Sequence, residues 1–559
     1  MKKTSKLVRP TLRANALLLL VVGFMVVALN VRFWGIVFDA TDLGGLRGVG
    51  VIASIGAALF GLTLLMLLPL SLRWTFKPGL ALALILAAGA AYFIGDFGAV
   101  IDRHALASVY ETDAREAGEW INLRMLLSIG ALGILPAAVL WWIKIDWQGP
   151  VREILSRLKL AVIAFVLLGA AAAGFGKDIA SLLRNHMELR HIANPFALLA
   201  ANLSYLDHAR NDNRPLEKIG EDARRGSALP TGERPVVLLL AIGESARASS
   251  YSSNGYDRAT DPRMRALGVV NFSNVSSCGT NTATSLPCMF TDMGRRDYKD
   301  GVAKYRENLL DVLMRGGYDA VWLDNNTGSK KLAKRAKEVF LGNTEDPELC
   351  NAEGCFDEVL LGQLRRELPA VRRDTVFVIH LLGSHGPAYY ARYPKEFAKF
   401  APECRTNELQ KCSDQQLRNT YDNTILYADH ILASAAELLR DDPRIDPALL
   451  YVSDHGESLG EHGLYLHGAP YAIAPDQQTR VPMMLWAADR FSARRGLDPD
   501  CLRSHAEAPL SHDNFFHSVL GLADVKTGVR KPALDIFGTC AAQGANTGAT
   551  STPAQAPAR

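Results

Sequence analysis

The sequence has no cysteine in its first 277 residues, and all eight of its cysteines follow that point. Along the chain they fall into four pairs: Cys278 and Cys288, Cys350 and Cys355, Cys404 and Cys412, and Cys501 and Cys540. An even number of cysteines confined to one part of a chain indicates disulfides in an oxidising compartment. No Cys-x-x-Cys is present, which argues against a zinc site built from cysteine.

The sequence also lacks an excess of charge of either sign, with 61 Lys and Arg against 58 Asp and Glu. A net charge of +3 does not indicate the strongly basic surface that is typical of nucleic-acid-binding proteins. Few charges interrupt the apolar runs of the first third, Asp96 being the main exception, and no internal repeat is evident. Both absences argue against a transporter or channel.

Five apolar runs in the first third are long enough to cross a bilayer. They lie at Asn15–Phe33, Gly48–Leu72, Pro78–Val100, Met125–Ile143 and Leu158–Phe175. Basic residues gather before the first run, between the second and third, and between the fourth and fifth, which places those segments in the cytoplasm. Five spans then put everything after the last one on the far side, which in a bacterium is the periplasm.

The composition predicts a transmembrane domain over residues 1–176, followed by three further parts. Residues 177–234 are expected to form bridging amphipathic helices and a linker. Residues 235–540 alternate predicted strands and helices, among them a basic helix over 329–339, which indicates an α/β domain with a mostly parallel sheet. Residues 541–559, rich in Ala, Gly, Thr, Ser and Pro, are expected to be a disordered tail.

Polar side chains follow four predicted strands of this domain where each strand ends. They are Glu244, Asp324 with Asn325 and Asn326, His380 with His385, and Asp454 with His455. In open α/β sheets, ligands bind beyond the carboxyl ends of the strands. Carboxylate and imidazole groups are ligands that zinc accepts. The pattern therefore predicts a metal-dependent site at this edge of the sheet.

A second unusual stretch, residues 276–290, is a hydroxyl-rich turn that leads into a short helix. A hydroxyl at a helix N-terminus faces the positive end of the helix dipole, which favours an alkoxide and an incoming phosphate. The residue types alone leave four candidates for a nucleophile: Thr280, Thr282, Thr284 and Ser285.

Five motifs together resemble the membrane-bound phosphoethanolamine transferases, a family that modifies lipid A within the alkaline phosphatase superfamily. They are Gly243–Arg247, Ser277–Thr280, Ser384–Tyr390, Asp454–Gly460 and Tyr465–Gly468. The resemblance covers nearly the whole chain and implies an alkaline-phosphatase-like catalytic domain in the periplasm of a multi-pass inner-membrane protein. It also implies transfer of phosphoethanolamine from phosphatidylethanolamine to lipid A, with release of diacylglycerol and lower susceptibility to polymyxin.

Carried over residue by residue, the resemblance implies that Thr280 is the nucleophile. Glu244, Thr280, Asp454 and His455 match the ligands of one tightly bound zinc ion, and His385 and His467 match residues that bind a second zinc or the phosphate. Asn326, Lys330 and His380 match positions near the phosphoethanolamine group, and Thr112 and Glu116 match a membrane-proximal substrate loop. The expected partners are the donor lipid and lipid A, with no nucleic acid, and the expected state is a monomer embedded in the membrane.

Other functions compete with this interpretation. A related enzyme could transfer glycerophosphate, as lipoteichoic-acid-type synthases do, or could be a periplasmic sulfatase. The sequence Cys278-Gly279-Thr280 does not fit the Cys/Ser-x-Pro-x-Arg context of a sulfatase nucleophile. A zinc protein that only binds ligands would tolerate loss of the nucleophile. Lipopolysaccharide core sugars and periplasmic glucans are alternative acceptors.

Overall fold

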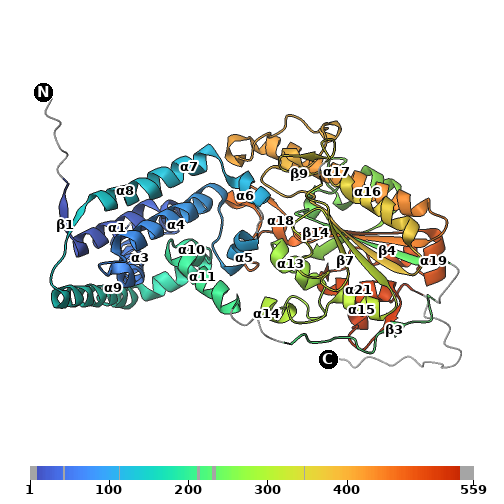
Figure 1. Cartoon of the computed structure of the whole chain (residues 1–559), viewed down its shortest axis with the longest axis horizontal. Coiled ribbons are helices and arrows are strands. Elements are labelled where there is room, and N and C mark those ends of the chain that lie inside the picture. The colour runs from blue at the N-terminus through green and yellow to red at the C-terminus, as the bar shows by residue number, and fades with distance from the viewer. Residues whose placement is uncertain are drawn as a thin grey trace. The chain divides into compact units, whose positions relative to one another are not determined.

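The computed structural model describes residues 9–41, 45–111, 114–209, 215–229, 234–344 and 346–541. The chain divides into two compact units, whose elements are labelled in Figure 1. The helical unit comprises Met1–Asp212, Asn407–Asp414 and Ser458–Pro475; the sheet unit comprises Asn213–Thr406, Gln415–Glu457 and Asp476–Arg559. Two stretches from the later part of the sequence therefore pack with the N-terminal helices.

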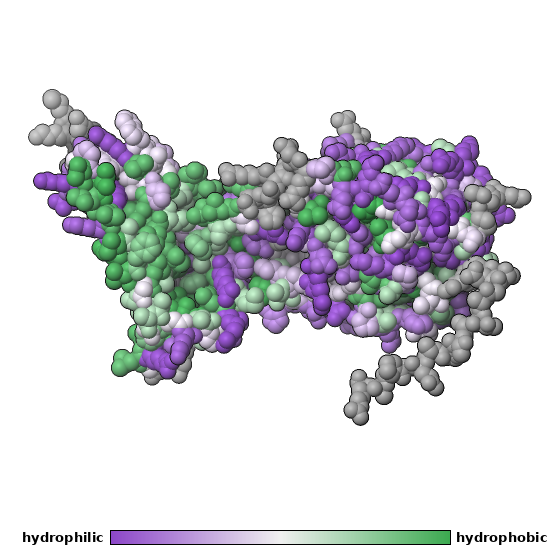
Figure 2. Space-filling view, turned by 90° about the horizontal axis from the view of Figure 1, so that it is seen from below, coloured by the Kyte–Doolittle hydropathy of each residue, from purple (hydrophilic) through white to green (hydrophobic). Residues whose placement is uncertain are grey.

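The helical unit is built from long apolar helices. Their bounds are α3 (Leu46–Leu67) with η1 (Leu68–Ser71), α4 (Phe76–Phe97), α7 (Leu123–Ile129) with η2 (Gly130–Ile134) and α8 (Leu135–Trp142), and α9 (Pro150–Asn185). Among the described residues, four such stretches are long and apolar enough to span a membrane. Apolar side chains cover much of the face of this unit seen in Figure 2, whereas hydrophilic ones dominate the sheet unit. The second to fifth expected spans are thus confirmed as helices.

Smaller elements complete the helical unit. They are β1 (Thr11–Arg13), which pairs in parallel with β2 (Lys144–Asp146), and the helices α5 (Arg103–Glu111), α6 (Ala114–Trp120), α10 (Leu189–Ile192) and α11 (Phe196–Ala209).

The first expected span, Asn15–Phe33, falls on a bent pair of helices that together are long and apolar enough to count as a fifth span. Helix α1 (Ala14–Ala28) and helix α2 (Val31–Ala40) meet at an angle of 61°. Asn30 lies buried at the break, donates to the carbonyl of Asn194 at 2.7 Å and accepts its N–H at 2.9 Å. A buried amide needs hydrogen-bond partners, and the break supplies them. We call these two residues the asparagine pair.

A short hairpin from the later sequence belongs to the helical unit. Its strands are β12 (Ser458–Leu459) and β13 (Tyr465–Leu466). Both terminal nitrogens of Arg32 donate to the carbonyl of Gly463 in the hairpin turn, at 3.2 and 3.3 Å. Gly98, which caps α4 at φ 70°, lies so close that a Cβ there would stand 2.6 Å from the same oxygen. We call Arg32, Gly98 and Gly463 the hairpin clamp.

The sheet unit is organised around eight strands in the order β15-β5-β14-β11-β4-β10-β6-β7. Their bounds are β4 (Val236–Gly243), β5 (Val270–Ser276), β6 (Asp319–Asp324), β7 (Lys337–Phe340), β10 (Thr375–His380), β11 (Asp446–Ser453), β14 (Arg480–Ala487) and β15 (Leu510–Ser511). Strand β14 is antiparallel to both neighbours, and the other pairs are parallel. The predicted mostly parallel sheet is confirmed.

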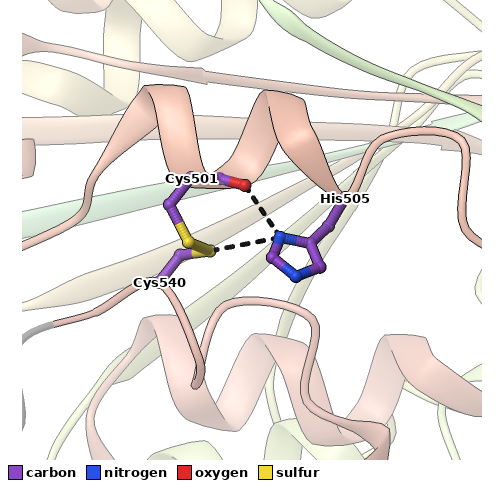
Figure 3. Close-up of side chains that lie close together, drawn as sticks. All are labelled: Cys501, His505 and Cys540. Carbon is purple, nitrogen blue, oxygen red and sulfur yellow. Dashed lines mark hydrogen bonds between the residues drawn. A yellow bond between two sulfur atoms is a disulfide. The ribbon is translucent and has the colours of Figure 1, made fainter.

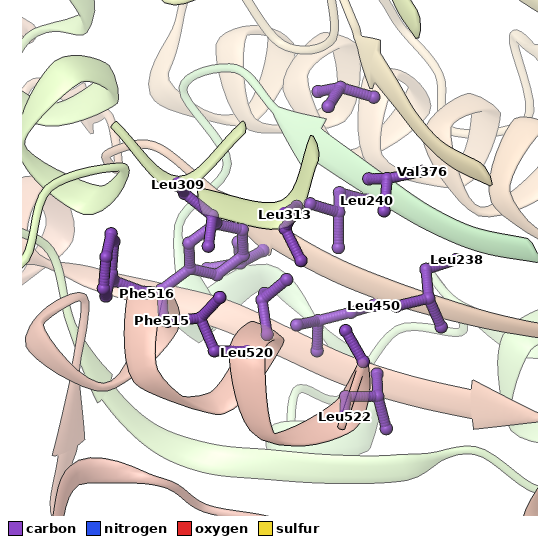
Figure 4. Packing of buried hydrophobic residues seen from close by; sticks show 14 of the residues in the cluster. Leu238, Leu240, Leu309, Leu313, Val376, Leu450, Phe515, Phe516, Leu520 and Leu522 are labelled. Carbon is purple, nitrogen blue, oxygen red and sulfur yellow. The ribbon is translucent and has the colours of Figure 1, made fainter. Parts of the chain in front are cut away.

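One part of the core of this unit lies between the sheet and two helices, α15 (Leu309–Arg315) and α21 (Asp513–Leu522). Figure 4 shows leucines of β4 and β11 facing leucines of α15 and Phe515, Phe516, Leu520 and Leu522 of α21. All eight residues of β4 are buried, as expected for a central strand covered on both faces.

Further helices of the sheet unit include α13 (Thr282–Met289), α16 (Glu358–Glu367), α19 (Asp489–Arg495) and α20 (Pro499–Ser504), as well as α17 (Asp414–Arg440), whose first residue falls in the helical unit. The prediction of a basic helix over 329–339 is wrong, because this stretch forms a turn that leads into β7. Lys330 and Lys331 adopt φ of 48° and 71°, in the left-handed region that an α-helix does not use.

Disulfides join Cys278 to Cys288, Cys350 to Cys355, and Cys501 to Cys540. Cys404 and Cys412 are disulfide-bonded as well. Figure 3 shows the long-range bridge, where Nδ1 of His505 bonds the carbonyl of Cys501 at 2.9 Å and lies 3.8 Å from Sγ of Cys540. Because both sulfurs are in the disulfide, this group offers no thiolate to a metal.

Candidate metal centre and nucleophile

Three buried ligand groups converge where the two central strands end. Strands β4 and β11 run in parallel register, so Glu244 after β4 and Asp454 after β11 leave the sheet at the same edge. The ligand atoms of Glu244, Asp454 and His455 all lie within 4.8 Å of one another, and none of the three residues is exposed. His455 Nε2 is 3.2 Å from Glu244 Oε1 and 3.5 Å from Asp454 Oδ2. The predicted clustering of these three residues is present in the structure.

The backbone around this cluster is closely packed. Gly456 follows the cluster, and a Cβ there would lie 2.0 Å from the carbonyl oxygen of Gln477. Its N–H donates to the carbonyl of Gln478 at 3.0 Å. The Asp-His-Gly sequence therefore needs glycine because the chain leading into β14 passes directly against it.

The electrostatics of the cluster suit a cation. Burial and repulsion from Glu244 raise the pKa of Asp454 to about 6. Burial lowers the pKa of His455, but the charges of Asp454 and Glu244 outweigh it and raise the pKa to about 10. Nδ1 of His455 bonds the carbonyl of Gly456 at 2.9 Å, which leaves Nε2 directed at the carboxylates.

The donor set fits a divalent metal. Asp454 Oδ2 is buried and makes no hydrogen bond to any described residue. Such an unsatisfied oxygen is costly unless a ligand completes it. Two carboxylates and one imidazole nitrogen, with a hydroxyl beside them, match the oxygen and nitrogen ligands that zinc binds in four-coordinate sites.

Thr282, the first residue of α13, brings a hydroxyl against this cluster. Thr282 Oγ1 donates to Glu244 Oε2 at 2.9 Å and lies 3.3 Å from His455 Nε2. Asn281 caps the helix by accepting the N–H of Thr284 at 2.9 Å, which fixes where the helix begins. Thr280, the residue that the resemblance favoured, precedes the cap and is 5% exposed. The contacts therefore favour Thr282 among the four candidate nucleophiles, and the role of Thr280 stays a prediction.

Ser285, another open candidate, is fully buried. Its Oγ donates to the carbonyl of Asp454 at 2.5 Å and accepts the N–H of Gly279 at 3.2 Å. A hydroxyl that is fully buried and already both donates and accepts a hydrogen bond is not placed to attack a lipid phosphate, which argues against Ser285 as the nucleophile.

Asn326 and His380, two expected headgroup residues, lie against the cluster. Asn326 Nδ2 donates to Glu244 Oε2 at 2.8 Å and to the carbonyl of Leu381 at 3.0 Å. His380 Nε2 is 3.3 Å from the same nitrogen, and its Nδ1 is 2.8 Å from Asp324 Oδ2. Burial lowers the pKa of His380, but the charge and hydrogen bond of Asp324 outweigh it and the pKa is raised. Asp324 was expected only as a strand-end residue.

The positions of the other five expected site residues are as follows. His385 is buried after β10, and Lys330 is half-buried in the turn after β6. His467 follows β13 in the helical unit. Thr112 lies outside the described residues; Glu116 lies in α6, but its side chain is not among those described. The roles expected for these five residues stay predictions.

Sequence reasoning missed His512, which immediately precedes α21. It is 2% exposed, and burial lowers its pKa to about 3, so the imidazole is neutral. A lone Ser-His-Asp sequence near the end of the chain has no local feature that separates it from an ordinary helix start. Only the tertiary structure shows that it lies beside the cluster.

A buried metal-type cluster with an adjacent hydroxyl, at the carboxyl edge of a mostly parallel sheet, defines the sulfatase and alkaline phosphatase class of enzymes. The sequence model of the family described as Sulfatase matches residues 236–525. A second model, described as Phosphoethanolamine transferase EptA/EptB, matches residues 59–210.

Comparisons over the whole chain identify the family. The chain is 41% identical over 535 residues to phosphoethanolamine transferase EptA of Escherichia coli K12, covering 95% of this chain and 98% of that protein. It is 35% identical over 540 residues to phosphatidylethanolamine transferase Mcr-1 of Escherichia coli, covering 94% and 97%. The structure matches integral membrane lipooligosaccharide phosphoethanolamine transferase A of Neisseria meningitidis with a TM-score of 0.92 at 34% identity, covering 95% and 100%.

The chain belongs to the phosphoethanolamine transferase family, and the resemblance seen in the sequence is confirmed. It is a transferase of the bacterial inner membrane, with several membrane spans and its catalytic sheet unit in the periplasm.

Proposed function

We propose that this enzyme transfers phosphoethanolamine from phosphatidylethanolamine to lipid A through a covalent intermediate on Thr282. The observation that carries the proposal is the contact of the Thr282 hydroxyl with Glu244 and His455, at 2.9 and 3.3 Å, in a member of the family. Thr282 replaces Thr280 in the role of nucleophile and in the fourth ligand position.

The reaction has two balanced halves. In the first, Thr282 Oγ1 forms a bond to the donor phosphorus, the bond from phosphorus to the diacylglycerol oxygen breaks, and that oxygen takes up the proton that Thr282 loses. In the second, an oxygen of the acceptor attacks the same phosphorus, the Thr282 oxygen leaves, and Thr282 regains a proton. Two displacements at one phosphorus constitute covalent, ping-pong catalysis.

Zinc, held by Glu244, Asp454, His455 and Thr282, would supply the Lewis acidity that lowers the pKa of the hydroxyl and neutralises phosphoryl oxygens. The protein residues orient the reactants. The bond of Thr282 to Glu244 Oε2 directs the hydroxyl, and Asn326 holds the same carboxylate oxygen at 2.8 Å. The N-terminus of α13 begins at Thr282 and contributes partial positive charge where the phosphoryl group would bind.

The proposal assigns the other expected residues to the substrates. His385 and His467 would hold a second zinc or the phosphate and protonate the leaving oxygen. His380 and Lys330 would contact the phosphoethanolamine group. Thr112 and Glu116 would belong to the membrane-proximal substrate loop that the family resemblance implies.

Lipid A is the proposed acceptor because the similar proteins act on related glycolipids. The Neisseria meningitidis protein is described as a lipooligosaccharide phosphoethanolamine transferase. A more distant relative, 27% identical over 493 residues, is the Kdo(2)-lipid A phosphoethanolamine 7''-transferase of Escherichia coli K12. Adding an amine to lipid A phosphates would weaken their Coulomb attraction for polymyxin and other cationic peptides. The enzyme is proposed to act as a monomer.

Mass spectrometry of the trapped intermediate tests the donor and the nucleophile. The full-length protein in zinc-containing detergent is incubated with phosphatidylethanolamine, quenched in acid, reduced and digested. Tandem spectra of the peptide that contains residues 278–288 then place the phosphoethanolamine mass on one hydroxyl. We expect the adduct on Thr282, together with one equivalent of diacylglycerol.

Two matched variants sharpen this test. Thr282→Ala should abolish both the adduct and diacylglycerol release, whereas Thr280→Ala, two residues away in the same turn, should retain them. An adduct on Thr280 would refute Thr282 as the nucleophile but would still support phosphatidylethanolamine as the donor. Absence of adduct and diacylglycerol would refute the donor, and the assay would be repeated with a glycerophosphate lipid. Lipid A mass spectra from cells that express the two variants test the acceptor.

A further inference from the structure

The buried imidazole of His512 connects the turn before Thr282 to the end of β11. Its Nδ1 accepts the backbone N–H of Cys278 at 3.1 Å. Because Nδ1 is the acceptor, Nε2 carries the proton, and it donates to the carbonyl of Ser453 at 3.0 Å. His512 thus joins the nucleophile turn to the residue that precedes Asp454.

Ser285 makes a second connection beside the first. Its Oγ accepts the N–H of Gly279 at 3.2 Å and donates to the carbonyl of Asp454 at 2.5 Å. Consecutive residues of the turn, Cys278 and Gly279, are therefore tied to consecutive residues of the strand end, Ser453 and Asp454. We call His512 and Ser285 the double bridge.

The double bridge acts on the geometry of the site and not on the substrate. His512 is 2% exposed and Ser285 is fully buried, so neither side chain reaches a bound lipid. The turn and the strand end belong to segments far apart in the sequence, and no strand pairing joins Cys278 to Ser453. The disulfide Cys278–Cys288 fixes the turn to α13 but does not fix it to β11.

We propose that His512 and Ser285 are positioning residues that set the distance from the Thr282 hydroxyl to the Glu244–Asp454–His455 cluster. The inference rests on the proposed role of Thr282 and extends it to a pair of residues outside the metal and substrate set. A displacement of about 1 Å at a reacting atom can cost about 100-fold in rate, so loss of either bridge should slow phosphoryl transfer to Thr282 strongly.

Single-turnover formation of the Thr282 adduct tests the proposal in the full-length, zinc-loaded enzyme. His512→Asn keeps an acceptor near the Nδ1 position, His512→Gln keeps a donor near the Nε2 position, and Ser285→Ala removes the second bridge. We expect each change to slow adduct formation by about 10- to 100-fold while zinc content and the KM for the donor stay within a factor of about two. The shape of the pH–rate profile should not change, because His512 transfers no proton in the reaction.

Two buried residues of α21 provide matched controls. His517 accepts a backbone N–H on Nδ1 at 3.1 Å, and Ser518 accepts one on Oγ at 2.9 Å, in each case from the chain after α21. His517→Asn and Ser518→Ala should lower the unfolding temperature as much as the bridge variants do, but should leave the adduct rate unchanged. Combining His512→Asn with Ser285→Ala should cost less than the product of the single effects, because both release the same turn.

The outcomes are distinguishable. If the bridge variants form the adduct as fast as the controls, the positioning role is wrong and the proposed function stands. If all six proteins lose rate only in proportion to stability, His512 and Ser285 are merely structural. If the wild-type enzyme forms no adduct on Thr282, the proposed function fails first and this inference falls with it.

Discussion

Zinc binding should depend on pH in a way set by His455. Its Nε2 lies 3.2 Å from Glu244 Oε1 and 3.5 Å from Asp454 Oδ2, and the pKa of the metal-free imidazole is raised to about 10. A metal binds only the neutral nitrogen, so binding must displace this proton. Affinity should therefore rise with pH throughout the range below the raised pKa.

The expected magnitude follows from the two pKa values of the site. Above the pKa of Asp454, which is about 6, one proton leaves on binding, and the dissociation constant should fall about tenfold, or about 1.4 kcal/mol, per pH unit. Below about pH 6 the carboxyl group of Asp454 is also protonated and a second proton must leave. The slope should then approach about 100-fold per pH unit.

Competition with a fluorescent chelator measures the dissociation constant of the full-length protein in detergent across this range. Calorimetry in two buffers of different ionisation enthalpy counts the protons released, which should be about one near neutral pH and approach two at acid pH. His430→Ala, which removes an imidazole of α17 outside the cluster, should leave both slopes unchanged. A dissociation constant that stays flat from about pH 6.5 to 8.5 would refute the reasoning.

Three further predictions follow from the fold. Gly98→Ala should disrupt the hairpin clamp, because φ is 70° and the new Cβ would stand 2.6 Å from the carbonyl oxygen of Gly463. Turnover of the donor lipid should therefore fall. The control Gly95→Ala, in α4, should be neutral, because no atom lies within 4 Å of the added Cβ. Asn194→Ala should lower stability in detergent by about 1–3 kcal/mol, because it removes the side-chain amide that donates to the buried carbonyls of Leu29 at 3.2 Å and Ala87 at 2.7 Å; an unfolding temperature equal to that of the wild type would contradict this. Burial raises the pKa of Asp429 to about 6, so this group contributes more to folding as the pH falls from about 6 to 4. Asp429→Asn should remove that gain, and a difference in unfolding temperature from wild type that is the same at every pH would count against it.

The metal cluster could be predicted from the sequence because each of its residues directly follows the end of a predicted strand. Glu244 and Asp454 each follow a continuous apolar run, and parallel neighbouring strands must end at the same edge of a sheet. His455 needs only its neighbour in sequence to reach the same place. The family motifs, which extend over the whole chain, then narrowed the chemistry to phosphoethanolamine transfer.

The nucleophile and the residues that position it could not be identified from the sequence alone, because their roles depend on tertiary contacts. Choosing among the four hydroxyls requires the tertiary contacts of Thr282 with Glu244 and His455, which form just inside the helix that Asn281 caps. The basic stretch after β6 has helix-forming composition, yet its left-handed residues make it a turn. His512 has no sequence signal because its partners are backbone groups more than fifty residues away.

The helical unit includes two stretches of chain, residues 407–414 and 458–475, that are encoded within the gene segment for the catalytic domain. The two units are therefore interleaved in the gene, and no single cut separates them. A chimera that exchanges only the N-terminal helices between two relatives would match one protein's helices with the other's hairpin. Working chimeras, and truncated domains used for inhibitor screening, should therefore be designed around all five junctions between the two units in the sequence.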